Sequence, residues 1–244
     1  MNSAIFIRWV LLTALVSTLA MCAAYAQKQL QEDSIKTSGG DLKITFIGHG
    51  TLMLTYAGKV IHADPVSMYT DYATLPKADL ILVTHEHGDH LDIKAIQAAS
   101  TANTAIIVNP SSAKNLPNCT VLKNGEDKTV SGIKVEAVPA YNLEKPFHPK
   151  GNGNGYILTF GDKRVYIAGD TENVAEIKAL KNIDVAFLPM NQPYTMTPEQ
   201  VAEVAKAMQP KVLYPYHFGN TDTGKLVGLL KDEKGIEVRI RNLQ

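Results

Sequence analysis

The fold is decided by the stretch Leu80-Ile81-Leu82-Val83-Thr84-His85-Glu86-His87-Gly88-Asp89-His90. Its first four residues form a continuous apolar run, which is typical of a buried strand. Side chains two positions apart at a strand end point the same way, so His85 and His87 can share one metal ion. Asp89 and His90 follow a turn and suit a second ion. Imidazole and carboxylate donors together favour zinc, and they also bind manganese or iron.

The N-terminal residues have the pattern of an export signal. Arg8 precedes an apolar stretch over residues 9–20, and Ala24-Tyr25-Ala26 has the small-x-small form of a cleavage site. We therefore predict a signal peptide over residues 1–26 and a periplasmic or secreted chain with no stable membrane association after cleavage. A retained membrane anchor stays open as the alternative.

The rest of the chain is predicted to be one domain. Residues 27–40 are polar and are expected to form a flexible leader, and residues 41–244 are expected to form the domain itself. Lys+Arg 24 and Asp+Glu 24 balance, so no basic surplus indicates nucleic-acid binding. Cys119 is the single cysteine after residue 26, which excludes an internal disulfide in the cleaved chain.

The chain also repeats itself weakly at a nearly constant offset. Each copy contains a strand, a turn with glycine and a second strand that ends in an aspartate, Asp64 or Asp170, followed by two further strands. A helix is expected in each copy, over residues 92–99 and 197–208, and the second begins with a capping box. The matching strand segments are 54–64 and 158–170, 78–83 and 183–188, and 105–110 and 211–215.

The motif His-x-His-x-Asp-His at a strand end resembles the metal-binding motif of the metallo-β-lactamase superfamily. That resemblance implies an α/β fold, a four-layer αββα sandwich of two similar halves with two divalent metal ions at their shared edge. It further implies that Asp170 bridges both ions and that His217 binds the second. His148 is the candidate third histidine for the first ion. Asn142 stands where many members carry that histidine, so the choice between the two residues stays open.

Two further positions are expected to support the site. Asp64 is expected to accept the N–H of a metal-binding histidine. His49 either contacts the substrate or caps a turn. Four segments resemble the branch of L-ascorbate-6-phosphate lactonase-like hydrolases: Gly48-His49-Gly50-Thr51, Ala63-Asp64-Pro65, Phe147-His148-Pro149-Lys150-Gly151 and Tyr194-Thr195-Met196.

The expected function is metal-dependent hydrolysis of a small molecule. A metal-bound hydroxide would attack an ester, lactone, amide or phosphoester, and Asp89 would orient it while binding metal. Tyr194 either donates a hydrogen bond to the developing oxyanion or simply packs as a loop aromatic. A metal-binding module without catalysis, and a di-iron redox member of the superfamily, are the alternatives.

Overall fold

The computed structural model describes residues 30–243. The expected signal peptide, residues 1–26, lies outside the described residues. Within 30–243, no helix combines the length and the apolar character needed to cross a bilayer.

Two mixed sheets of seven strands each form the centre of the domain. The first sheet runs in chain order and contains β1 (Gln31–Thr37), β2 (Gly40–Gly48), β3 (Thr51–Tyr56), β4 (Lys59–Ala63), β5 (Leu80–Val83), β6 (Ala105–Val108) and β7 (Thr120–Val121). The second contains β8 (Asp127–Val130), β9 (Ile133–Ala140), β10 (Gly153–Phe160), β11 (Lys163–Ile167), β12 (Val185–Pro189), β13 (Val212–Tyr216) and β14 (Glu237–Val238).

Both sheets pair their strands in the same pattern. The first three pairings along the chain are antiparallel and the last three are parallel, in each sheet. The sheet that begins at β1 is therefore repeated by the sheet that begins at β8. The structure confirms the two similar halves predicted from the repeated sequence.

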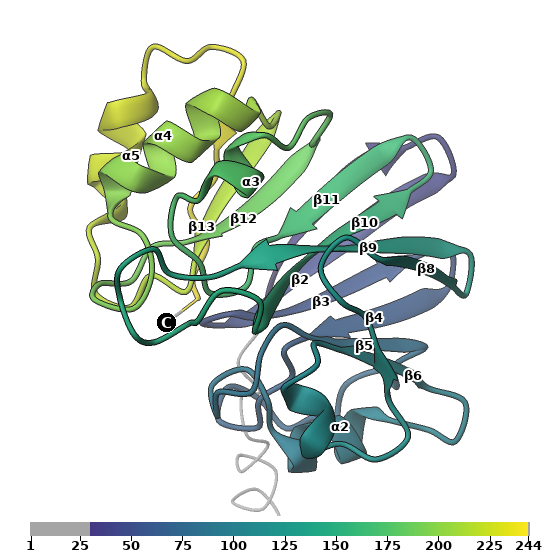
Figure 1. The fold of residues 1–244 in the computed structure, drawn as a ribbon. Coiled ribbons are helices and arrows are strands. Elements are labelled where there is room, and N and C mark those ends of the chain that lie inside the picture. The colour runs from purple at the N-terminus through teal and green to yellow at the C-terminus, as the bar shows by residue number, and fades with distance from the viewer. Residues whose placement is uncertain (1–29, 244) are drawn as a thin grey trace, which may run out of the picture. The chain divides into compact units, whose positions relative to one another are not determined.

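Short helices cover the outer faces of the two sheets. Figure 1 shows α2 outside the first sheet, and α3, α4 and α5 outside the second. The helices are α2 (Ile93–Ala99), α3 (Ala175–Lys178), α4 (Pro198–Met208) and α5 (Thr223–Leu230), with a 3-10 turn at Ser112–Lys114. This arrangement confirms the predicted four-layer sandwich. The sequence did not predict α3 and α5, which follow the ends of β11 and β13.

The longest helix, α4, begins as its sequence predicts. The Thr197 side chain accepts from the backbone N–H of Gln200, and the Gln200 side chain accepts from the Thr197 N–H, so the capping box is complete. Val201, Val204 and Met208 are buried on one face of the helix. That face joins the apolar core beneath it.

Residues 31–37 correct the expected flexible leader. They form β1, which pairs with β2 along its whole length. The strand is polar, and it is held by ion pairs: the Arg241 guanidinium lies 2.7 Å from the Asp33 carboxylate, and the Tyr214 hydroxyl donates to the same group. Burial would raise the pKa of Asp33, but the hydrogen bonds from Arg241 and Tyr214 lower it. The domain therefore begins at Gln31 and not at residue 41.

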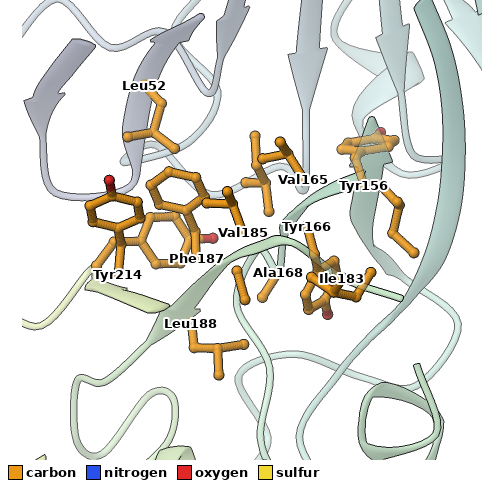
Figure 2. Packing of buried hydrophobic residues seen from close by; sticks show 14 of the residues in the cluster. Leu52, Tyr156, Val165, Tyr166, Ala168, Ile183, Val185, Phe187, Leu188 and Tyr214 are labelled. Carbon is orange, nitrogen blue, oxygen red and sulfur yellow. The ribbon is translucent and has the colours of Figure 1, made fainter. Parts of the chain in front are cut away.

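Aromatic rings join the two sheets in the core. Phe46 of β2 contacts Tyr214 of β13, with 5.0 Å between ring centroids, and Phe187 of β12 stacks on Tyr214 at the same separation. Figure 2 shows Phe187 and Tyr214 side by side in this cluster. Each fully buried ring stabilises the fold by roughly 1.5–3 kcal/mol. This core fixes the sheets so that their strand ends meet along one edge.

Candidate metal centre

The metal-binding candidates come from strand ends of both halves. His85 follows β5, Asp170 follows β11 and His217 follows β13. His148 lies in the loop between β9 and β10. Because carboxyl ends of parallel strands share one edge of a sheet, residues far apart in the sequence meet there.

The first group of donors contains His85, His87 and His148. Their nearest ring nitrogens lie within 4.8 Å of one another. The Nε2 of His85 is 3.1 Å from the Nδ1 of His87. The structure thus brings His148 to the two histidines that the sequence paired.

The second group contains His49, Asp89, His90 and His217. One donor atom of each lies within 4.8 Å of the others. Asp89 Oδ2 is 3.3 Å from His49 Nε2, 3.5 Å from His217 Nε2 and 3.8 Å from His90 Nε2. The His49 side chain therefore faces the donors of the second group. This position is at the site itself and is not explained by capping of a turn.

Asp170 lies between the two groups. Its Oδ2 is 3.2 Å from His148 Nε2 and 3.3 Å from His217 Nε2, and its Oδ1 is 3.4 Å from His90 Nε2. One carboxylate thus contacts donors of both groups, as a bridging ligand must.

Asp64 and Thr84 orient histidines of both groups from behind. Asp64 Oδ2 accepts from His90 Nδ1 at 2.8 Å and from Thr84 Oγ1 at 2.7 Å. Thr84 Oγ1 in turn lies 3.1 Å from His85 Nδ1. These contacts turn the Nε2 atoms of His85 and His90 toward the cluster. Asp64 thus accepts from a histidine of the second group, whereas the sequence analysis did not single out Thr84.

Asn142 holds His148 and does not compete with it. Its Oδ1 accepts from His148 Nδ1 at 2.7 Å and from the His148 backbone N–H at 3.0 Å. Its Nδ2 donates to the carbonyl of Tyr194 at 2.9 Å. His148 Nε2 is therefore the atom that faces Asp170, and the amide oxygen is already engaged. The geometry favours His148 over Asn142 for the first group.

Glu86 anchors the loop that carries His148. Its carboxylate accepts from Asn152 Nδ2 at 2.6 Å and from the Ser111 hydroxyl. Asn109 donates to the carbonyl of Asn152 at 2.6 Å and also to the Ser111 hydroxyl. Glu86, which lies between His85 and His87 in the sequence, thus connects the loop that carries His148 to the segment after β6. The sequence alone does not reveal this contact.

The charges of the cluster suit a cation. Burial lowers the pKa of His85 well below its usual range, and the charge of His90 adds to that effect. Burial opposes protonation of His90 too, but the carboxylates of Asp170 and Asp64 raise the pKa of His90 to about 9. Burial would raise the pKa of Asp170, but the charges of His217 and His90 lower it well below its usual range. His90 would release its proton when a divalent cation takes that place.

The backbone around the cluster is unusually constrained. His49, Asp64 and His217 adopt positive φ angles, of 52°, 47° and 46°, which non-glycine residues rarely do. A Cβ at Gly50 would lie only 2.9 Å from Cε1 of His90, so glycine permits this close approach. Residues with such rarely populated backbone angles persist only where the surrounding structure holds them in place, and they are concentrated at functional sites.

A cleft of about 340 Å³ opens beside both groups. Asp89 and Asp170 line it, together with Asn191, Tyr194 and Phe147. Tyr194 is 45% exposed, so it does not pack in the core. A molecule in this cleft would contact the metal-binding candidates directly.

Residues 43–217 match the family model described as "Beta-lactamase superfamily domain". The chain belongs to the metallo-β-lactamase superfamily. Within this superfamily, a relative from Thermococcus kodakarensis described as a UPF0173 metal-dependent hydrolase is 31% identical, over 72% of this chain and 84% of its own.

Two solved structures share the fold of this chain. A protein from Parabacteroides distasonis, inferred to be a metal-dependent hydrolase, is 58% identical with a TM-score of 0.86, over 88% of this chain and all of its own. CmlA, a diiron β-hydroxylase from Streptomyces venezuelae, is 17% identical with a TM-score of 0.65, over 86% of this chain and 54% of its own. The second likeness concerns the fold alone.

Proposed function

We propose that this member of the superfamily is a dinuclear metal-dependent hydrolase of a small-molecule ester, lactone, amide or phosphoester. Lactones are included because of the resemblance to the lactonase-like branch. The observation that carries the proposal is the convergence of the two donor groups on Asp170 beside an open cleft. A purely structural metal site is normally closed to solvent, whereas a catalytic one leaves room for a reactant.

Buried polar atoms in the cluster fit a pair of cations. Within residues 30–243, the Nε2 atoms of His90, His148 and His217 and the Oδ1 of Asp170 are buried without a hydrogen-bond partner. Each unsatisfied buried group costs roughly 1–3 kcal/mol. These nitrogen and oxygen donors are those that zinc prefers, with manganese or iron as alternatives.

Each set of residues would hold one ion. His85, His87 and His148 would hold the first, Asp89, His90 and His217 the second, and Asp170 both. Bound ions of this kind lower the pKa of a water molecule and polarise the bond under attack.

The chain's own side chains orient the reaction. Asp89 is 44% exposed toward the cleft, so its carboxylate can hold the attacking water while it faces the second group. Burial would raise the pKa of Asp89, but the neighbouring imidazoles of His217 and His49 hold it well below its usual range. Asp89 is therefore ionised at neutral pH. Tyr194 lines the same cleft, and its hydroxyl would donate to the oxygen on which charge develops.

Metal analysis and one pair of variants test this function. Protein purified without added metal and then titrated with zinc should approach two equivalents and hydrolyse at least one neutral ester or phosphodiester. Asp89→Asn keeps the shape of the side chain, removes its charge and should lower kcat by about 100-fold or more. Asp127 is an exposed aspartate on β8, and Asp127→Asn is the matched control that should leave kcat unchanged. Zinc content that stays near zero would refute the metal centre.

We further propose that the chain is exported, with cleavage after Ala26, on the basis of the sequence of residues 1–26. N-terminal sequencing of the protein from periplasm or medium should find Gln27 first. Recovery of an intact Met1 from a membrane fraction would instead support an anchor.

A further inference from the structure

Exposed apolar side chains gather at the mouth of the cleft. Phe147 is 37% exposed and Tyr194 is 45% exposed, and their rings meet edge-on with 5.0 Å between centroids. Leu143, in the same loop as Phe147, is 57% exposed. Large apolar side chains left open beside a catalytic cleft indicate a surface for an apolar ligand group.

No lysine or arginine clamp for a phosphate is found in the same cleft. Among residues 30–243, no lysine or arginine lines it. Lys145 belongs to the loop that carries Phe147, but its ammonium lies 2.7 Å from Glu172, 3.2 Å from the Gln192 side-chain oxygen and 3.1 Å from the Thr195 carbonyl. An ammonium has three donors, so these three acceptors satisfy it. Lys145 therefore has no donor left for a substrate phosphate.

The second lysine of the loop is also engaged elsewhere. The ammonium of Lys150 lies 3.1 Å from Glu176 and 4.8 Å from the centroid of the Tyr141 ring. Sites that recognise phosphate normally direct lysine or arginine donors at it. Among the lining residues, the carboxylates of Asp89 and Asp170 would face the proposed ions, so those ions and not a lysine or arginine would supply positive charge toward a substrate.

We propose that the substrate is a carboxylic ester or amide whose apolar acyl group lies against Phe147 and Tyr194. This inference rests on the proposed hydrolytic function. Asn191, which also lines the cleft, would supply an uncharged polar contact for the same substrate. A volume of about 340 Å³ lies at the small end of ligand pockets, so the acyl group is short.

Substrates with a common leaving group test the proposal. The zinc-loaded full-length protein is assayed with p-nitrophenyl acetate, p-nitrophenyl butyrate and bis(p-nitrophenyl) phosphate. We expect kcat/KM to be about tenfold higher for butyrate than for acetate, since two added methylenes would be buried, and to be lowest for the phosphodiester.

Variants at Phe147 separate an apolar contact from a general defect. Phe147→Ala should abolish the preference for butyrate, and Phe147→Leu should keep part of it. Val227→Ala removes another exposed apolar side chain, on α5, and should leave both kcat/KM values unchanged. Because Phe147 precedes His148, the zinc content of each variant is measured and should equal that of the wild type.

Three outcomes would overturn the proposal. A phosphodiester hydrolysed faster than both esters, or a Phe147→Ala variant that slows acetate and butyrate equally, refutes the substrate class and leaves the hydrolase function standing. A zinc-loaded protein that hydrolyses none of the three substrates refutes the function and the inference together.

Discussion

Replacement of Asn142 by alanine should weaken metal binding even though Asn142 itself faces no ion. The substitution removes the acceptor of His148 Nδ1 at 2.7 Å and of the His148 backbone N–H at 3.0 Å. It also breaks the bond to the Tyr194 carbonyl. Loss of such an outer hydrogen-bond partner typically costs about 10- to 100-fold in metal affinity, or about 1.4–2.7 kcal/mol. The sequence alone offered Asn142 only as an alternative to His148, because the contact between the two residues depends on the fold of their loop.

Competition between the protein and a chromophoric zinc chelator measures this effect. Asn142→Ala should raise the Kd of one of the two ions by the stated factor and leave the other nearly unchanged. Asn142→Asp keeps an acceptor for His148 Nδ1 and should bind zinc about as tightly as the wild type. Asn103→Ala, at an exposed turn, controls for the loss of an amide. His148→Ala should have the largest effect. A wild-type Kd in Asn142→Ala, alongside weakened binding in His148→Ala, would refute the reasoning.

Three further predictions concern stability. Removal of both ions with a chelator should lower the Tm, because a ligand at 1,000 times its Kd stabilises the folded state by about 4 kcal/mol. A thermal-shift assay measures this effect, and a Tm that does not respond to added zinc would argue against the site. Asp33→Asn should lower the free energy of unfolding by about 1–3 kcal/mol at pH 7. Because folding lowers the pKa of Asp33, this difference should persist above the unfolded value of about 3.9 and disappear as the pH falls through the folded value. Urea unfolding at pH 7 and pH 3 checks it, and an equal difference at both would contradict the ion pair. Thr197→Ala should cost about 1 kcal/mol through loss of the cap, measured by urea unfolding, and an unchanged midpoint would show that the capping box contributes nothing.

Periodicity and local motifs were enough to predict the frame of the fold. The repeated strands, the capping box at Thr197 and the apolar run before His85 are all local patterns, and each corresponds to an element of the structure. The two halves could therefore be predicted from the sequence because each half repeats the same local pattern of strands and turns.

Contacts between distant segments could not be predicted in this way. The strand Gln31–Thr37 contains almost no apolar residues, and it is held by Arg241 and Tyr214 near the other end of the chain. Thr84 and Glu86 likewise act through partners that only the folded chain brings near. Such residues carry no local pattern, since their roles arise from packing.

The proposed metal centre would take its donors from both halves of the duplicated domain. His85, His87, Asp89 and His90 belong to the first half, and His148, Asp170 and His217 belong to the second. Each bound ion would therefore be a reversible crosslink between the halves, in a chain whose single cysteine beyond residue 26 cannot form an internal disulfide. Separation of the halves would require prior release of the ions, so the rate at which a protease degrades the protein would depend on the metal supply around it.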